Sequence, residues 1–119
     1  MIRVLLDTNA MVYFFDKKTD IRAMLDRGLN TAYELYYADV SISELKRIKR
    51  NDVVRWLPSI SVKKVSPVEA KGPVDDVLMD ISRANEMHLL TFDKVLAQRA
   101  LSAAIPIIRI SGQNANIEK

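Results

Sequence analysis

The 119-residue sequence has no cysteine and one histidine, His88. These absences exclude a disulfide scaffold, a thiolate metal centre, an iron–sulfur cluster and a catalytic cysteine, and they argue against a histidine-rich zinc site. Glycine and proline are also scarce, at 3 and 4 residues, which excludes collagen-like and low-complexity chains. No segment approaches the ~20 apolar residues of a membrane span, and the apolar run at 1–6 is too short for a signal peptide. We therefore expect a cytoplasmic protein with no membrane segment.

What the sequence does contain fits one folded unit. Hydrophobic residues make up 49% of the chain and charged residues 28%, which is enough apolar material for a buried core. The length matches a single domain, predicted over residues 1–111, and residues 112–119 read as a polar, frayed C-terminal tail. The net charge of +3 only weakly favours a polyanionic binding partner.

Hydrophobic periodicity predicts strands that alternate with helices. The predicted strands cover residues 2–6, 34–38, 60–65, 88–92 and 106–110, with 60–65 as an edge strand. The predicted helices cover residues 10–15, 20–29, 41–50 with an extension over 52–57, 75–87 and 95–104, and a loop is expected at 66–73. Nearly uniformly apolar strands joined through helices indicate a parallel sheet covered on both faces. The predicted fold class is α/β, a three-layer α/β/α sandwich with a central parallel β-sheet.

Acidic residues follow the predicted strands. Asp7 ends the first strand, Asp93 follows the strand at 88–92, and Asp75 and Asp76 begin a helix. Glu44 lies in the first turns of the helix after the second strand. Ligand sites of open α/β sheets lie beyond the carboxyl ends of the strands, so we expect these side chains to converge at one edge.

Each of these acids also has a simpler interpretation. An Asp at a strand-to-helix junction is a favoured N-cap worth ~1 kcal/mol, and Glu44 on a solvated helix face would pair weakly with Arg47. Convergence favours more than capping, because two carboxylates ~4 Å apart repel by ~4 kcal/mol at an effective dielectric of 20. A cluster needs a cation or shared protons. Oxygen ligands alone indicate Mg²⁺ or Mn²⁺, and carboxylate-bound divalent cations typically serve phosphodiester hydrolysis.

Four short segments together point to a known family. They are Leu-Leu-Asp-Thr-Asn at 5–9, Ile-Ser-Glu-Leu-Lys at 42–46, Val-Asp-Asp-Val-Leu at 74–78, and Leu-Thr-Phe-Asp at 90–93 followed by Leu96. In this order and on these predicted elements, the chain resembles a PIN-domain nuclease over roughly its whole ordered length. The resemblance implies a metal-dependent endoribonuclease of the RNA-processing type or the toxin half of a toxin–antitoxin pair.

The resemblance also implies site roles by position. The catalytic acidic quartet would be Asp7, Glu44, Asp75 and Asp93, with Asp7, Asp75 and Asp93 as the metal carboxylates. Thr8, Asn9 and Thr91 would orient those carboxylates. Asp75 is preferred as the third acid because it shares a helix face with Leu78 and Ser82. Asp76, on a wetter face, is the alternative.

Two features of the sequence concern RNA. A basic run, Lys46, Arg47, Lys49 and Arg50, follows Glu44 and is interpreted either as an RNA-binding patch or as a solvated helix face. Several aromatic residues, Tyr13 and Trp56 among them, would stack on unpaired bases or pack in the core. Phe92 departs from the family pattern, in which a small, polar or basic residue is more usual.

The expected partners are RNA, an antitoxin or RNA-processing protein, and a second copy of the chain through Phe14 and Phe15. The alternative function is a non-catalytic RNA-binding or scaffold domain of the same fold. A phosphorylatable receiver domain is a further rival, but such a domain usually needs an acidic pair after the first strand, and only Asp7 is present.

Overall fold

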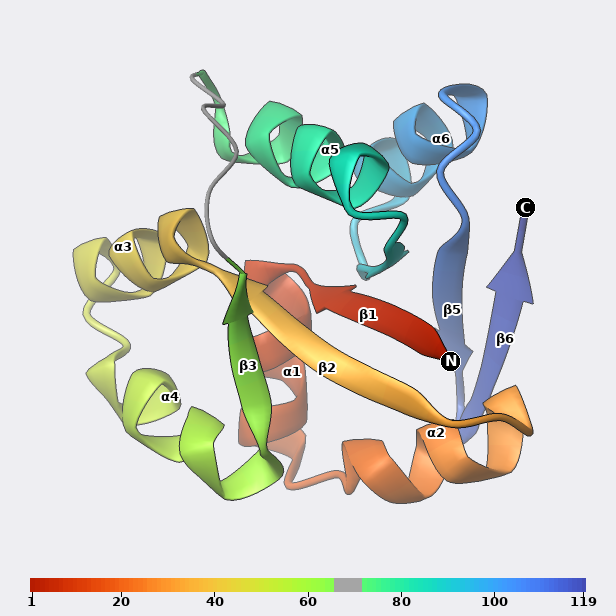
Figure 1. Ribbon diagram of the computed structural model, residues 1–119. Coiled ribbons are helices and arrows are strands. Elements are labelled where there is room, and N and C mark those ends of the chain that lie inside the picture. Colours follow the sequence, from red (N-terminus) through yellow and green to blue (C-terminus); the bar gives the residue numbers. More distant parts are fainter. Residues whose placement is uncertain (66–71) are drawn as a thin grey trace.

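The computed structural model describes residues 1–65 and 72–119, so most of the loop predicted at 66–73 falls outside the described residues (Figure 1). The elements in chain order are β1 (Ile2–Leu6), α1 (Thr8–Lys17), α2 (Ile21–Leu29), β2 (Tyr33–Ala38), α3 (Asp39–Arg47), α4 (Asn51–Trp56), a 3₁₀ turn (Leu57–Ile60), β3 (Val62–Val65), α5 (Val74–Ala84), β4 (His88–Leu90), α6 (Lys94–Ser102), β5 (Ile107–Ser111) and β6 (Asn114–Glu118). No helix within these ranges is long and apolar enough to span a lipid bilayer.

A six-stranded sheet in the order β3-β2-β1-β4-β5-β6 forms the centre of the molecule. All neighbouring strands are parallel except β5 and β6, which are antiparallel. Helices α5 and α6 cover one face of the sheet, and α1 and α2 cover the other (Figure 1). The predicted three-layer α/β/α sandwich is therefore confirmed, with β3 at one edge as expected.

Alternation along β1 divides the core into two layers. Leu5 and its neighbour Leu89 belong to the cluster packed with α5 and α6. Val4, Leu6 and Leu90 belong to the cluster packed with α1, α2 and α4. All five side chains are fully buried, because both faces of these central strands are covered by helices.

The polar C-terminal segment is not frayed, and this corrects the expectation for residues 112–119. Residues 114–118 form β6, which pairs with β5 so that Ile117 lies opposite Ile108. Gly112, with φ 62°, supplies the left-handed conformation that the tight turn requires. Ala115 is buried, and it alternates with exposed asparagines, a pattern too short and too polar to stand out from a tail.

Helix α2 approaches β6 closely, which explains a glycine within the helix. A Cβ atom built on Gly28 would lie 2.9 Å from the Ala115 Cβ, nearer than real side chains pack. The neighbouring Arg27 donates a hydrogen bond from Nη2 to the Gln113 carbonyl oxygen at 3.2 Å. Gly28 therefore lies within the helix because the close approach to β6 leaves no space for a side chain.

Two of the helix starts are set by the aspartates that the sequence singled out. Helix α1 begins at Thr8 rather than residue 10, because Asp7 is its N-cap and accepts the Thr8 N–H at 2.7 Å. Asp93 caps α6 and accepts the N–H groups of Val95 and Leu96 at 2.9 and 3.2 Å. The capping interpretation is thus correct for both residues, which does not conflict with a second role.

Candidate active site

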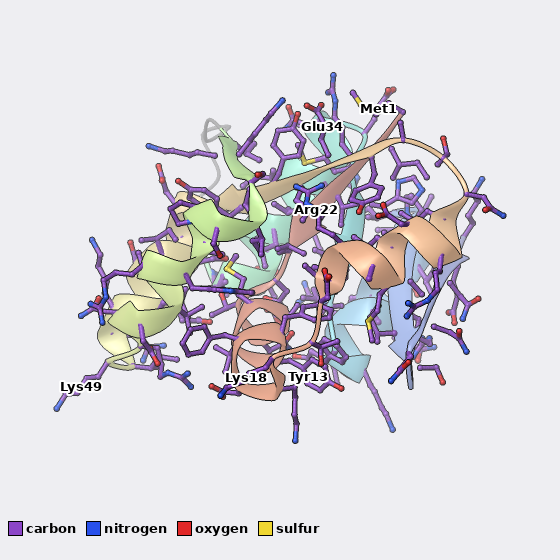
Figure 2. All side chains as sticks on the ribbon, turned by 90° about the horizontal axis from the view of Figure 1, so that it is seen from below. Met1, Tyr13, Lys18, Arg22, Glu34 and Lys49 are labelled. Carbon is purple, nitrogen blue, oxygen red and sulfur yellow. The ribbon has the colours of Figure 1, made fainter. Side chains whose placement is uncertain are left out.

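The carboxyl ends of β1 and β4 bring two of the sequence motifs together. Leu6 lies opposite Leu90 in the parallel pair, so Asp7 and Thr91 follow neighbouring strands directly. The Asp7 N–H donates to the Leu90 carbonyl oxygen at 3.0 Å and extends this pairing by one step. Figure 2 shows Met1 and Glu34 on one side of the molecule and Tyr13 and Lys49 on the opposite side, toward which β1 runs.

Asp7 is the buried centre of a hydrogen-bond network. Its side chain is 5% exposed, and its Oδ2 accepts the Thr91 hydroxyl at 2.7 Å. The same Thr91 Oγ1 accepts the Asp93 N–H at 3.0 Å, so one hydroxyl joins the two aspartates. Asn9 Oδ1 accepts the Phe92 N–H at 3.2 Å and ties the two strand ends a second time. Thr91 therefore contacts both aspartates, whereas Asn9 fixes the backbone at Phe92, between Thr91 and Asp93.

Burial raises the pKa of Asp7 to about 6, although the hydrogen bonds from Thr91 and Thr8 oppose that rise. The negative charges of Asp75 and Glu44 raise it further. The pKa of Asp75 is also raised, first by burial and then by the charge of Asp93. Asp7 and Asp75 are therefore both affected by negative charges that come from other segments of the chain.

The third acid of the cluster is distinguished by its partners. Asp76 accepts a hydrogen bond from Arg99 Nη2 of α6 at 2.5 Å, so its charge is balanced by an exposed ion pair. Asp75, one residue earlier on α5, is close enough to Asp93 and Glu44 for their charges to raise its pKa. The geometry therefore favours Asp75 over Asp76 as a member of the acidic group.

Glu44 has two sets of neighbours. Its carboxylate lies 3.8 Å from Arg47 Nη2 at i+3, the pairing expected of a helix surface. Its side chain is only 26% exposed, however, and its charge reaches both Asp7 and Asp75. It therefore lies at the margin of the acidic group.

The basic run divides into residues with different surroundings. Arg50 is held in ion pairs with Asp16 at 2.6 Å and with Asp52 at 3.1 Å, so it joins α1 to the start of α4. Lys46, Arg47 and Lys49 are exposed at the end of α3. The exposed part of the run that could meet a phosphate backbone is therefore these three residues rather than all four.

Two aromatic expectations change with the structure. Phe14 is 1% exposed and packs in the core, so it offers no surface to a second copy of the chain. Phe92 is stacked on Tyr13, with ring centroids 4.2 Å apart and ring planes at 31°. Reasoning from the sequence noted Phe92 only as a departure. Two features of the sequence could have indicated the contact: Phe92 lies between two predicted site residues, and Tyr13 and Phe14 form an aromatic pair.

Among residues 1–65 and 72–119, no three acidic or histidine side chains lie close enough together to hold a metal ion as they stand. The hydroxyl of Thr8, next to Asp7, is buried and has no hydrogen-bond partner within these residues. The described residues therefore contain carboxylates whose charges raise the pKa values of Asp7 and Asp75, and a buried hydroxyl without a partner on the residue that follows Asp7.

Comparison with known proteins gives consistent neighbours at low identity. No protein-family model matches the chain. Ribonuclease VapC4 of Methanocaldococcus jannaschii is 23% identical over 117 residues, covering 91% of this chain and 89% of that protein. The PIN domain endonuclease Utp24 superposes with a TM-score of 0.82 at 20% identity, covering 98% of this chain and 90% of the other. VapBC-1 from nontypeable Haemophilus influenzae gives a TM-score of 0.63 at 16% identity, covering 86% of this chain and 94% of the other.

Proposed function

Because the chain has the PIN-domain fold, we propose that it is a divalent-cation-dependent endoribonuclease that hydrolyses phosphodiester bonds in RNA. The observation that carries the proposal is the network in which Thr91 joins Asp7 to Asp93 while the charges of Asp75 and Glu44 raise the pKa of Asp7. A buried carboxylate surrounded by like charges is costly for stability and is typical of functional sites. The relative named as a ribonuclease supports RNA as the substrate.

The donor set fits a hard cation. All candidate ligands are carboxylates, and the residue after Asp7, Thr8, carries a buried hydroxyl without a hydrogen-bond partner among the described residues. Asp7, Asp75 and Asp93 would hold Mg²⁺ or Mn²⁺, with Glu44 as the fourth acid. When bound, such a cation supplies a water activated for attack and neutralises charge that develops on the phosphate.

The chain's own groups prepare this chemistry. The Thr91 hydroxyl and the Thr8 N–H hold the two Asp7 oxygens at 2.7 Å each, which leaves each oxygen a further lone pair for a ligand. With a pKa of about 6, the Asp7 carboxylate loses its proton near neutral pH. Lys46, Arg47 and Lys49 would bind phosphates that flank the cleaved bond.

A protein partner, either an antitoxin or an RNA-processing protein, is part of the same proposal. Similarity to VapC4 and to VapBC-1 favours the first, and the higher TM-score to an endonuclease that is not named as a VapC protein favours the second. Expression of the chain alone in a bacterial host separates them. A toxin should arrest growth unless Asp7→Asn is present, whereas a processing nuclease should leave growth unchanged.

The central test is cleavage of a mixed set of single-stranded and hairpin RNAs with Mn²⁺, with EDTA, and with Asp7→Asn. We expect Mn²⁺-dependent cutting that EDTA abolishes and that Asp7→Asn lowers by roughly 1000-fold, the size of loss typical of a key electrostatic group. RNA that binds but is never cut would support the non-catalytic alternative. Cutting that survives Asp7→Asn would place the chemistry elsewhere.

A further inference from the structure

A hollow of about 300 Å³ lies beside Asp93, and most of the residues that line it do not belong to the acidic group. We name it the Asp93 hollow, and its walls include Thr91, Phe92, Asp93, Lys94, Arg109 and Ile110. It lies where β4 ends, where α6 begins, and along the second half of β5. Because Thr91 and Asp93 also belong to the hydrogen-bond network of Asp7, any occupant of the hollow would lie directly next to the acids.

Phe92, which lines the Asp93 hollow, has a ring that is held in place by its neighbours. Phe92 stacks on Tyr13 at 4.2 Å between centroids and meets the edge of Phe14 at 5.8 Å. Its backbone N–H is fixed by Asn9 Oδ1 at 3.2 Å. Phe92 nevertheless stays partly exposed. A ring that is already ordered loses little conformational freedom when a ligand packs against it, which favours binding.

Two cations flank the same hollow. Lys94 is exposed at the first position of α6, and Arg109 is exposed on β5. Arg109 is oriented by Glu118, which accepts from Nε at 2.5 Å and from Nη2 at 3.2 Å. The Asp93 carboxylate accepts two backbone N–H groups of α6 through Oδ1, which partly offsets its charge. The lining therefore includes a partly exposed aromatic residue, the exposed cation Lys94, and Arg109, whose charge is shared with Glu118.

We propose that the Asp93 hollow binds one unpaired nucleotide of the RNA, next to the scissile phosphate, with its base against Phe92 and its phosphate near Lys94 and Arg109. The inference rests on the proposed function for RNA as the ligand, and it adds the place where one nucleotide binds. A volume of about 300 Å³ is at the small end of ligand sites, which range over ~300–1,000 Å³. A paired base inside an A-form helix does not present its face, so duplex RNA is excluded from the hollow.

The test measures RNA affinity by fluorescence anisotropy in EDTA, so that it does not depend on cleavage. The probes are a 12-nucleotide single strand, its duplex, and single strands that carry one abasic nucleotide at each position in turn. We expect the single strand to bind better than the duplex, and one abasic position to lower wild-type affinity about tenfold, as loss of a stacked base does. Phe92→Leu should lose a similar factor on intact RNA and should no longer respond to the abasic position.

Two further variants control for folding and charge. Phe92→Tyr keeps the ring, so it should restore both the affinity and the abasic effect, whereas a merely structural role of Phe92 would give no base-dependent signal. Lys94→Gln should weaken binding more than Lys17→Gln, which removes the same charge from an exposed position on α1. An equal abasic penalty in Phe92→Leu and wild type, or equal affinity for duplex and single strand, would overturn the proposal.

The outcome is distinguishable from that of the endonuclease test. A base-dependent loss at Phe92 with no cleavage under Mn²⁺ would reject catalysis and retain the nucleotide site. Asp7-dependent cleavage with no base-dependent loss at Phe92 would retain catalysis and reject the nucleotide site.

Discussion

Two groups of carboxylates in this protein are assembled from distant parts of the chain, and their pKa values move in opposite directions. Asp16 and Asp52 flank Arg50, and hydrogen bonds from its guanidinium lower the pKa of both. Asp7 and Asp75 lie in the acidic group, where burial and neighbouring negative charges raise the pKa of both. The residue type is the same, and the surroundings decide the direction.

The two groups differ in whether a cation of the same chain neutralises the carboxylates. The Arg50 group joins α1 to α4 on the surface, and its charges are matched within the chain. Within residues 1–65 and 72–119, Asp7 forms no ion pair, and its side chain accepts hydrogen bonds from the Thr91 hydroxyl and the Thr8 backbone N–H. Such an arrangement costs stability, and proteins commonly accept this cost where a ligand must bind.

The largest expected effect separates the two adjacent aspartates of α5. Asp75→Asn should lower RNA cleavage by at least about 100-fold, because it removes a proposed metal ligand. Asp76→Asn should lower it less than about threefold, because it breaks only an exposed ion pair with Arg99. Single-turnover cleavage with Mn²⁺ measures both. Equal losses, or a larger loss for Asp76→Asn, would assign the third acid to Asp76.

A second prediction concerns pH and stability without metal. The folded pKa of Asp7 is about 6, against 3.8 for the unfolded side chain. The folded state therefore binds more protons between these values, so stability falls as pH rises from about 4 to 6, by about 3 kcal/mol for a shift of roughly two units. Asp7→Asn should remove this loss and leave the variant more stable than wild type at pH 7. Urea unfolding in EDTA from pH 4 to pH 7 measures the difference.

Asp16→Asn supplies the matched comparison for the pH prediction. The folded pKa of Asp16 is lowered, so its contribution to stability is present above the unfolded pKa and is lost as pH falls through the folded value. This variant should therefore be less stable than wild type at neutral pH, with the gap closing in acid. A pH profile of the same sign for Asp7 and Asp16 would contradict the contrast between the two groups.

The smallest expected effects divide the basic run. Arg50→Gln should lower the free energy of unfolding slightly and leave the salt dependence of RNA binding unchanged, because Arg50 is engaged by Asp16 and Asp52 on the surface. Lys46→Gln should leave stability unchanged and reduce the slope of log affinity against log salt by about 0.7 for single-stranded RNA. Arg55→Gln, an exposed charge on α4, is the control. A reduced slope in Arg50→Gln would return this residue to the RNA surface.

The parts of the fold that the sequence predicted correctly are those with strong periodicity or a sharp boundary. The strand at 2–6 and the helix at 20–29 have such signals, and the structure contains both, with α2 over Ile21–Leu29. Strand β6 has only two apolar residues, so its pairing depends on contacts with β5 and α2 that no local pattern reveals.

The candidate site was predictable in its main members for a topological reason. Once Asp7 and Asp93 are assigned to the ends of parallel strands, the sheet must bring them to one edge. The partners of Arg50 and of Phe92 were not predictable. Asp16 lies 34 positions from Arg50 and Tyr13 lies on a helix far from β4, and such pairs depend on how the helices pack.

The close approach of Gly28 to Ala115 places an unusual demand on residue 28. Position 28 has no room for even a methyl group, although the residue is exposed and lies within an ordinary helix. Helix α2 therefore packs directly against the β5–β6 hairpin, and Arg27 of α2 adds a hydrogen bond to the turn of the hairpin. Local unfolding of α2 should therefore increase the rate of amide hydrogen exchange in β6, because the two elements pack against each other.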